Sequence, residues 1–99
     1  MLEARGWQVL ERRWRGGGGE IDLIVRRDAA LRFVEVRLRS LDDPAGLESV
    51  TPQKVGRVER AAETWLADYP GPVREACLMV ALLEPIDGEL RLTLLDDPV

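Results

Sequence analysis

The fold of this chain is constrained most by two segments of alternating polar and apolar residues, which lie on either side of a short turn. Residues 20–26 alternate polar and apolar side chains, and residues 31–39 follow the same pattern. Alternation of this kind is typical of half-buried β-strands, because successive side chains of a strand point to opposite faces of a sheet. The intervening Asp28-Ala29-Ala30 has the length of a hairpin turn. We therefore predict an antiparallel hairpin.

The apolar faces of the two strands restrict the pairing register to two alternatives. A two-residue turn at Asp28-Ala29 places Asp22 opposite Glu35, and a four-residue turn places Asp22 opposite Arg37. A register shifted by one residue from either alternative would turn every apolar side chain of one strand to the wrong face, so it is excluded. In both alternatives Asp22, Glu35 and Arg37 share one face, with β-carbons roughly 5–8 Å apart.

Two carboxylates on one face of a hairpin repel each other and destabilise it. Exposure to solvent, pairing with Arg37 and Arg39, or a divalent cation would each offset the repulsion. Mg²⁺ favours one or two carboxylates together with water and phosphate oxygens. The expected ligands are Asp22, Glu35, the backbone carbonyl of Val36 and, as an additional ligand, Glu20.

An ordinary solvated face is the alternative to a metal site, and two apolar residues argue against it. Ile24 and Phe33 lie on the same face as the charges. A helix is therefore expected to cover this face in part, and buried carboxylates need partners or a metal.

The rest of the chain predicts a mixed sheet with helices packed against it. Gly16-Gly17-Gly18-Gly19 lacks the Lys-Ser/Thr of a phosphate-binding loop and is expected to form a wide turn. The apolar stripe of the main helix is Val55, Val58, Ala62, Trp65 and Leu66. The expected elements are the end of a helix over 2–5 that Gly6 stops, strands over 7–14, 73–83 and 89–94, a polar loop over 40–50, a turn over 85–88, and a helix with Thr51 as N-cap and Pro52 at its first position.

Composition excludes several classes of function. The 99 residues are 45% hydrophobic and 32% charged, which predicts one globular domain over residues 1–99. The chain has no histidine and one cysteine, so histidine triads, zinc fingers and internal disulfides are excluded. Cys77 lies in an apolar run and is expected to be a core thiol. No segment reaches the roughly 18 apolar residues of a membrane span and no signal peptide opens the chain, so we expect a cytoplasmic protein.

The net charge of -4 taken alone argues against a nucleic-acid partner, but the charge is unevenly distributed along the chain. Residues 1–39 carry nine arginines and six acidic residues, whereas the acidic excess lies in the remainder. Such asymmetry can mark a binding face. The basic side chains expected to contact nucleic acid are Arg37, Arg39, Lys54 and Arg57. The alternative for Lys54 and Arg57, which lie one turn apart on the helix, is an ordinary solvated helix face.

The hairpin also carries a family resemblance. Gly19-Glu20-Ile21-Asp22-Leu23-Ile24, followed by Phe33-Val34-Glu35-Val36-Arg37, resembles the YraN-like family of small bacterial proteins. That family belongs to the restriction-endonuclease-like, PD-(D/E)XK superfamily, which includes Holliday-junction resolvases. The resemblance extends over residues 2–15 and through Lys54 and Arg57 to Trp65-Leu66.

The resemblance implies a restriction-endonuclease-like α-β-β-β-α-β core, with a mixed sheet flanked by helices. It implies that Asp22 and Glu35 hold Mg²⁺ or Mn²⁺ for hydrolysis of DNA, with Arg37 as a third catalytic residue. Arg37 stands where the superfamily has lysine, and an arginine stays protonated and cannot act as a base. The alternative is therefore an inactive nuclease-fold module that binds nucleic acid or a protein. The resemblance places Met1 in the middle of the family's first helix, so we expect a sheet face that is open to a partner, as in a homodimer.

Overall fold

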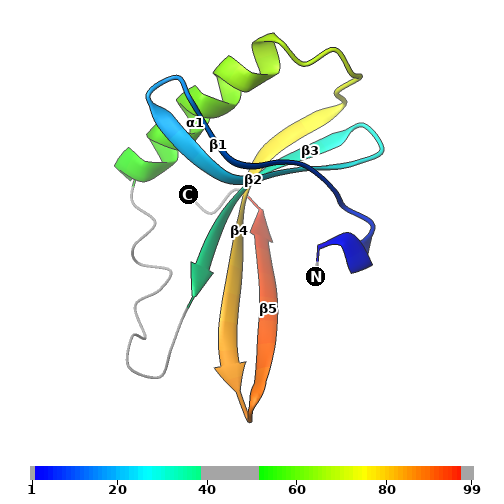
Figure 1. Cartoon of the computed structure of the whole chain (residues 1–99), viewed down its shortest axis with the longest axis vertical. Coiled ribbons are helices and arrows are strands. Elements are labelled where there is room, and N and C mark those ends of the chain that lie inside the picture. The colour runs from blue at the N-terminus through cyan, green and yellow to red at the C-terminus, as the bar shows by residue number, and fades with distance from the viewer. Residues whose placement is uncertain (1, 39–51, 97–99) are drawn as a thin grey trace.

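In the part of the chain that the structure describes, five strands form one sheet in the order in which they occur along the chain, and one α-helix packs on it (Figure 1). This computed structural model describes residues 2–38 and 52–96. Strands β3 and β4 pair in parallel and are joined through α1, whereas every other neighbouring pair is antiparallel. The expected mixed sheet is confirmed. Its elements are a 3-10 turn η1 (Glu3–Arg5), β1 (Gln8–Gly16), β2 (Gly19–Arg27), β3 (Ala30–Leu38), α1 (Pro52–Ala67), β4 (Glu75–Ile86) and β5 (Glu89–Asp96).

The hairpin β2–β3 adopts one of the two predicted registers. Its pairs run from Arg27↔Ala30 to Leu23↔Val34, which is the register of a two-residue turn. Asp28 in that turn has φ of 54°, a left-handed conformation that aspartate tolerates better than most residues. The four-residue alternative is therefore wrong.

The glycine run forms a tight turn rather than the expected wide one. Gly16 pairs with Gly19, and the two residues between them have φ of 60° and 81°, as in a two-residue hairpin turn of type I′. The turn also lies against α1. A Cβ at Gly17 would be 2.4 Å from Thr64 Oγ1, and one at Gly19 would be 2.5 Å from the Arg57 carbonyl oxygen. Glycine is required here for both the backbone conformation and the close approach to the helix.

Two apolar clusters hold the sheet, one on each face. The helical stripe is confirmed for four of its residues and gains Ala61. The cluster under α1 comprises Ile21, Ile24, Phe33, Ala61 and Ala62, with Trp14, Val58, Trp65, Leu66 and Leu78 packed against it. The cluster on the other face comprises Leu2, Trp7, Val25, Val34, Met79 and Ala81.

Ile21 corrects the simple alternation of β2. The sequence pattern places it on the face of Leu23 and Val25, but the structure buries it with Ile24 under α1. On β1, Arg13 lies between two residues paired with β2 and has φ of 50°. A left-handed residue interrupts a strand, so the regular facing of side chains breaks at this level.

The ends of the elements differ from expectation by a few residues. Gly6 stops η1 with φ of 89°, as predicted. The last turn is narrower than expected, because β4 continues through Pro85 and Ile86 and only Asp87 and Gly88 remain between the strands. The predicted loop over 40–50 and the N-cap at Thr51 lie outside the described residues. Among the helices of the described part, none is long and apolar enough to cross a membrane.

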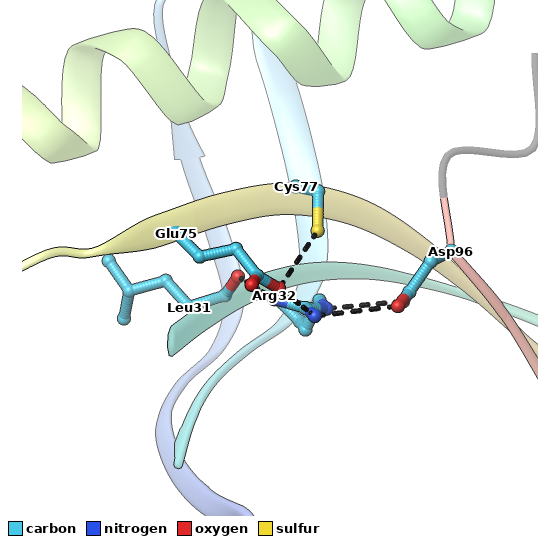
Figure 2. Close-up of polar contacts among 5 residues, drawn as sticks. All are labelled: Leu31, Arg32, Glu75, Cys77 and Asp96. Atoms are coloured by element: carbon cyan, nitrogen blue, oxygen red, sulfur yellow. Dashed lines mark hydrogen bonds and ion pairs between the residues drawn. The ribbon is translucent and has the colours of Figure 1, made fainter. Parts of the chain in front are cut away.

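A buried arginine ties together three strands (Figure 2). Arg32 on β3 is 7% exposed, and its Nε donates to Asp96 Oδ1 on β5 at 3.1 Å. It also forms an ion pair with Glu75 on β4 and donates to the Leu31 carbonyl. Cys77 lies beside Glu75 and is half-buried, so the expectation of a core thiol is wrong.

Arg32 was not expected in the core. Burial lowers the pKa of its guanidinium, but the hydrogen bonds to Asp96 and Glu75 outweigh that effect and raise the pKa above its ordinary value. The guanidinium also lies 5.3 Å from the centre of the Trp7 ring. Its charge is therefore compensated by two carboxylates and an aromatic face.

Candidate functional site

Strands β2 and β3 separate at Asp22. Their paired residues end at Leu23↔Val34, while β3 continues beside β4 as far as Leu38. Asp22 Oδ2 accepts a hydrogen bond from the Val36 backbone N–H at 2.8 Å. A side-chain carboxylate thus satisfies an amide on β3 beyond the last paired residues of the hairpin.

Glu35 and Arg37 lie on the same face of β3, as alternation predicts. Arg37 Nη2 is 2.6 Å from Glu35 Oε1, and each side chain is 23% exposed. The Arg37 Nε is buried and has no hydrogen-bond partner. Arg37 is therefore committed to its neighbouring carboxylate and is only partly accessible to a substrate.

The electrostatic surroundings of Glu35 show which charges gather here. Burial raises the pKa of Glu35, and the nearby Asp22 carboxylate raises it further. Arg37 and Lys54 act in the opposite direction. The structure therefore brings together two carboxylates from the hairpin and two cations, one from β3 and one from α1.

Lys54 enters the site from the first turn of α1. It lines a small pocket of about 20 Å³ together with Glu35 and Arg37, above the apolar side chains of Phe33 and Val58. That volume holds roughly one water molecule. The helix covers part of the polar face of the hairpin, as Ile24 and Phe33 predicted.

Glu20 and Arg57 lie at the margins of this group. Glu20 pairs with Arg15 at 3.4 Å, and its charge makes the smallest of the contributions that raise the pKa of Glu35. Arg57 is exposed on α1, where its carbonyl lies against the glycine turn. Arg39 lies outside the described residues.

The donor set suits a hard cation. Asp22 and Glu35 are neighbouring carboxylates, the number that Mg²⁺ takes together with water and phosphate oxygens. Within residues 2–38 and 52–96, no group of three or more carboxylate or thiol side chains is arranged to hold a metal ion by itself. Water or substrate oxygens would have to complete the coordination of a metal here.

The sequence matches the model of a family described as "Uncharacterised protein family UPF0102" over residues 1–85. A UPF0102 protein of Methylocella silvestris is 49% identical over 69 residues, which cover 70% of this chain and 55% of the relative. A UPF0102 protein of a Synechococcus strain is 43% identical over 91 residues, or 89% of this chain and 70% of the relative. One from Beutenbergia cavernae is 42% identical over 94 residues, or 91% and 78%. The chain thus spans little more than half of the first of these relatives.

Proposed function

This chain belongs to the uncharacterised protein family UPF0102, the YraN-like family, and we propose that it is a metal-dependent nuclease that hydrolyses phosphodiester bonds in DNA. The observation that carries the proposal is the position of Asp22. Its carboxylate lies where β2 and β3 separate, beside the half-buried Glu35 and within reach of its charge. The restriction-endonuclease-like fold is part of this proposal, and the order of the elements supports it.

Asp22 and Glu35 would bind Mg²⁺ or Mn²⁺, assisted by the Val36 carbonyl and Glu20. When bound, such a cation supplies Lewis-acid chemistry at a phosphate group and lowers the pKa of water. The charge of Asp22 and burial both disfavour the ionised form of Glu35. A divalent cation between the two carboxylates would reverse that local balance, which supports its assignment to this place.

The cations around the carboxylates have distinct proposed roles. Arg37 holds Glu35 at 2.6 Å and adds positive charge near the scissile phosphate. Lys54 and Arg57 lie one turn apart on α1 and would contact the phosphate backbone, together with Arg39. Contacts of this kind position DNA without reading its bases. We therefore propose selectivity for DNA structure, such as branches or single strands, in DNA processing or repair.

A non-catalytic module that binds nucleic acid or a protein is the second candidate, and Arg37 favours it. The guanidinium at the motif's lysine position is paired with Glu35 and cannot accept a proton from water. In this case the same carboxylates and cations would serve recognition, and DNA would bind without being cleaved.

Cleavage of branched and single-stranded DNA with Mg²⁺ or Mn²⁺ tests both candidates. Asp22→Asn and Glu35→Gln should each abolish cleavage, whereas Glu89→Gln, an exposed carboxylate at the start of β5, should retain it. Binding without cleavage by the wild type would overturn the nuclease and support the module. Absence of both binding and cleavage would overturn the nuclease and the nucleic-acid-binding form of the module.

A further inference from the structure

A second cleft lies between β1 and the C-terminal end of α1. Its volume is about 480 Å³, and three aromatic side chains line it: Trp14, Trp65 and Tyr69. Two carboxylates, Glu11 and Asp68, lie in the same lining. Trp65 follows Lys54 by eleven residues on the helix, a rise of roughly 16 Å. The cleft is therefore separate from the Asp22–Glu35 site.

The rings of the cleft are held by the fold. Trp65 stacks on Tyr69 with 4.7 Å between ring centroids and 23° between planes, and it meets Phe33 edge to face. The Tyr69 hydroxyl accepts a hydrogen bond from Arg26 at 3.2 Å. These contacts fix two of the rings before any ligand arrives, which reduces the entropy lost on binding.

The absence of a side chain at Gly16, beside the turn, leaves room for the ring of Trp14. A Cβ at Gly16 would lie 2.4 Å from the Trp14 six-membered ring, so the indole lies directly over this bare backbone. The third ring thus lies close to the backbone of its own strand. An aromatic group that is half-buried presents a surface for stacking or for a cation.

The charge of the lining decides between ligands. Within the described residues two carboxylates and no lysine or arginine line the cleft; the Arg26 guanidinium reaches the Tyr69 hydroxyl, so the two carboxylates leave an excess of negative charge. Aromatic faces attract cations, and guanidinium and ammonium groups are the cations that proteins carry. A nucleobase would also stack on these rings, but the carboxylates would repel the phosphates attached to it. We propose that this cleft binds an arginine or lysine side chain in a basic peptide segment of a partner protein.

The tryptophan side chains can report on binding in the cleft. The chain has three, and the third, Trp7, lies on the other face of the sheet under Arg27, whose guanidinium is 4.2 Å from its ring. NMR of the indole N–H groups in the full chain can therefore follow the cleft and a distant reporter together. The probe is a capped hexapeptide with two arginines, compared with the same peptide carrying glutamates and with a single-stranded oligonucleotide.

We expect the arginine peptide to shift the indole signals of Trp14 and Trp65 and to leave Trp7 unchanged. Neutralising the lining with Glu11→Gln and Asp68→Asn should weaken binding roughly three- to tenfold, the size of one or two exposed charge contacts. Glu59→Gln with Glu63→Gln removes the same charge from exposed positions of α1 outside the lining and should leave the affinity unchanged.

Three results would overturn the proposal. One is the absence of indole shifts up to about 5 mM peptide, the weak end of specific binding. Another is an equal response to the glutamate peptide or to the oligonucleotide. The third is equal weakening by the two pairs of substitutions, which would trace binding to net charge alone. Each result is independent of whether the Asp22–Glu35 site cleaves DNA.

Discussion

The carboxylate of Asp22 accepts a hydrogen bond from the backbone amide of Val36 at 2.8 Å, just beyond the last paired residues of β2 and β3. This contact gives Asp22 a structural role besides the proposed metal-binding one. The two roles can be separated, because an amide oxygen can replace a carboxylate as hydrogen-bond acceptor but not as an anionic ligand.

Asp22→Ala leaves the Val36 amide without its acceptor and should lower the free energy of unfolding by about 1–3 kcal/mol. Asp22→Asn keeps an acceptor oxygen and should cost less than about 1 kcal/mol. Urea denaturation followed by tryptophan fluorescence measures both. Both variants should lose metal-dependent cleavage. Equal stabilities of the two variants would show that the hydrogen bond contributes nothing.

Glu35→Gln should gain stability relative to the wild type as the pH rises. Burial and the charge of Asp22 raise the pKa of Glu35 above its ordinary 4.5. The folded protein therefore holds this proton more strongly than the unfolded chain. The resulting stabilisation is complete below pH 4.5 and is lost as the pH rises through the folded-state pKa.

Urea midpoints of both proteins between about pH 4 and pH 7.5 measure this effect. Because Asp22 contributes to the shift, the relative gain should be smaller when both proteins carry Asp22→Asn. A stability difference that does not change with pH would contradict the prediction.

The glycine turn offers a comparison of two neighbouring substitutions. Gly17 and Gly18 both have positive φ, so alanine at either should cost about 1 kcal/mol for the backbone conformation. A Cβ at Gly17 also collides with Thr64 and the carbonyl of Arg60, whereas one at Gly18 meets nothing within 4 Å. Gly17→Ala should therefore cost about 1–2 kcal/mol more, as overpacking does. Equal losses in thermal denaturation would show that the turn does not press against α1.

Because the guanidinium of Arg32 is buried, removing its two carboxylate partners should destabilise the fold more than removing the arginine itself. Glu75→Gln with Asp96→Asn leaves a charge that is 7% exposed without a carboxylate, and should destabilise the fold by about 3 kcal/mol. Arg32→Met removes that charge and leaves carboxylates that are half-exposed and can be hydrated. It should cost less than about 1.5 kcal/mol. Chemical denaturation of the two variants checks the order, and the reverse order would contradict it.

The sequence predicted the features that depend on local pattern. The hairpin followed from a period of two and a short turn, and the neighbourhood of Glu35 and Arg37 followed from their spacing on one strand. The pairing of Asp22 with an amide could not be read in the same way, because it depends on where two strands separate. The ligand and nucleic-acid roles of these residues stay predictions.

What the sequence missed depends on distant segments. The burial of Arg32 could not be predicted from its own strand, since its partners are 43 and 64 residues away. Ile21 was placed on the wrong face because the break in the alternation of β2, which lies beside the left-handed Arg13 of β1, is invisible to periodicity. The narrow glycine turn was missed although Gly17-Gly18 is a local signal for a two-residue hairpin turn. Its close approach to α1 could not be predicted from the sequence.

The connection of Arg32 to the last strand bears on how the chain is made. During synthesis β3 leaves the ribosome long before Glu75 and Asp96, so its arginine has neither carboxylate to meet. Enclosing an unpaired cation is costly, and closing the parallel β3–β4 pair already requires a long crossover. The N-terminal hairpins therefore cannot settle into their final packing as they emerge. Packing around Arg32 awaits β4 and β5, which makes the whole sheet, rather than the N-terminal hairpins alone, the unit that acquires a stable core.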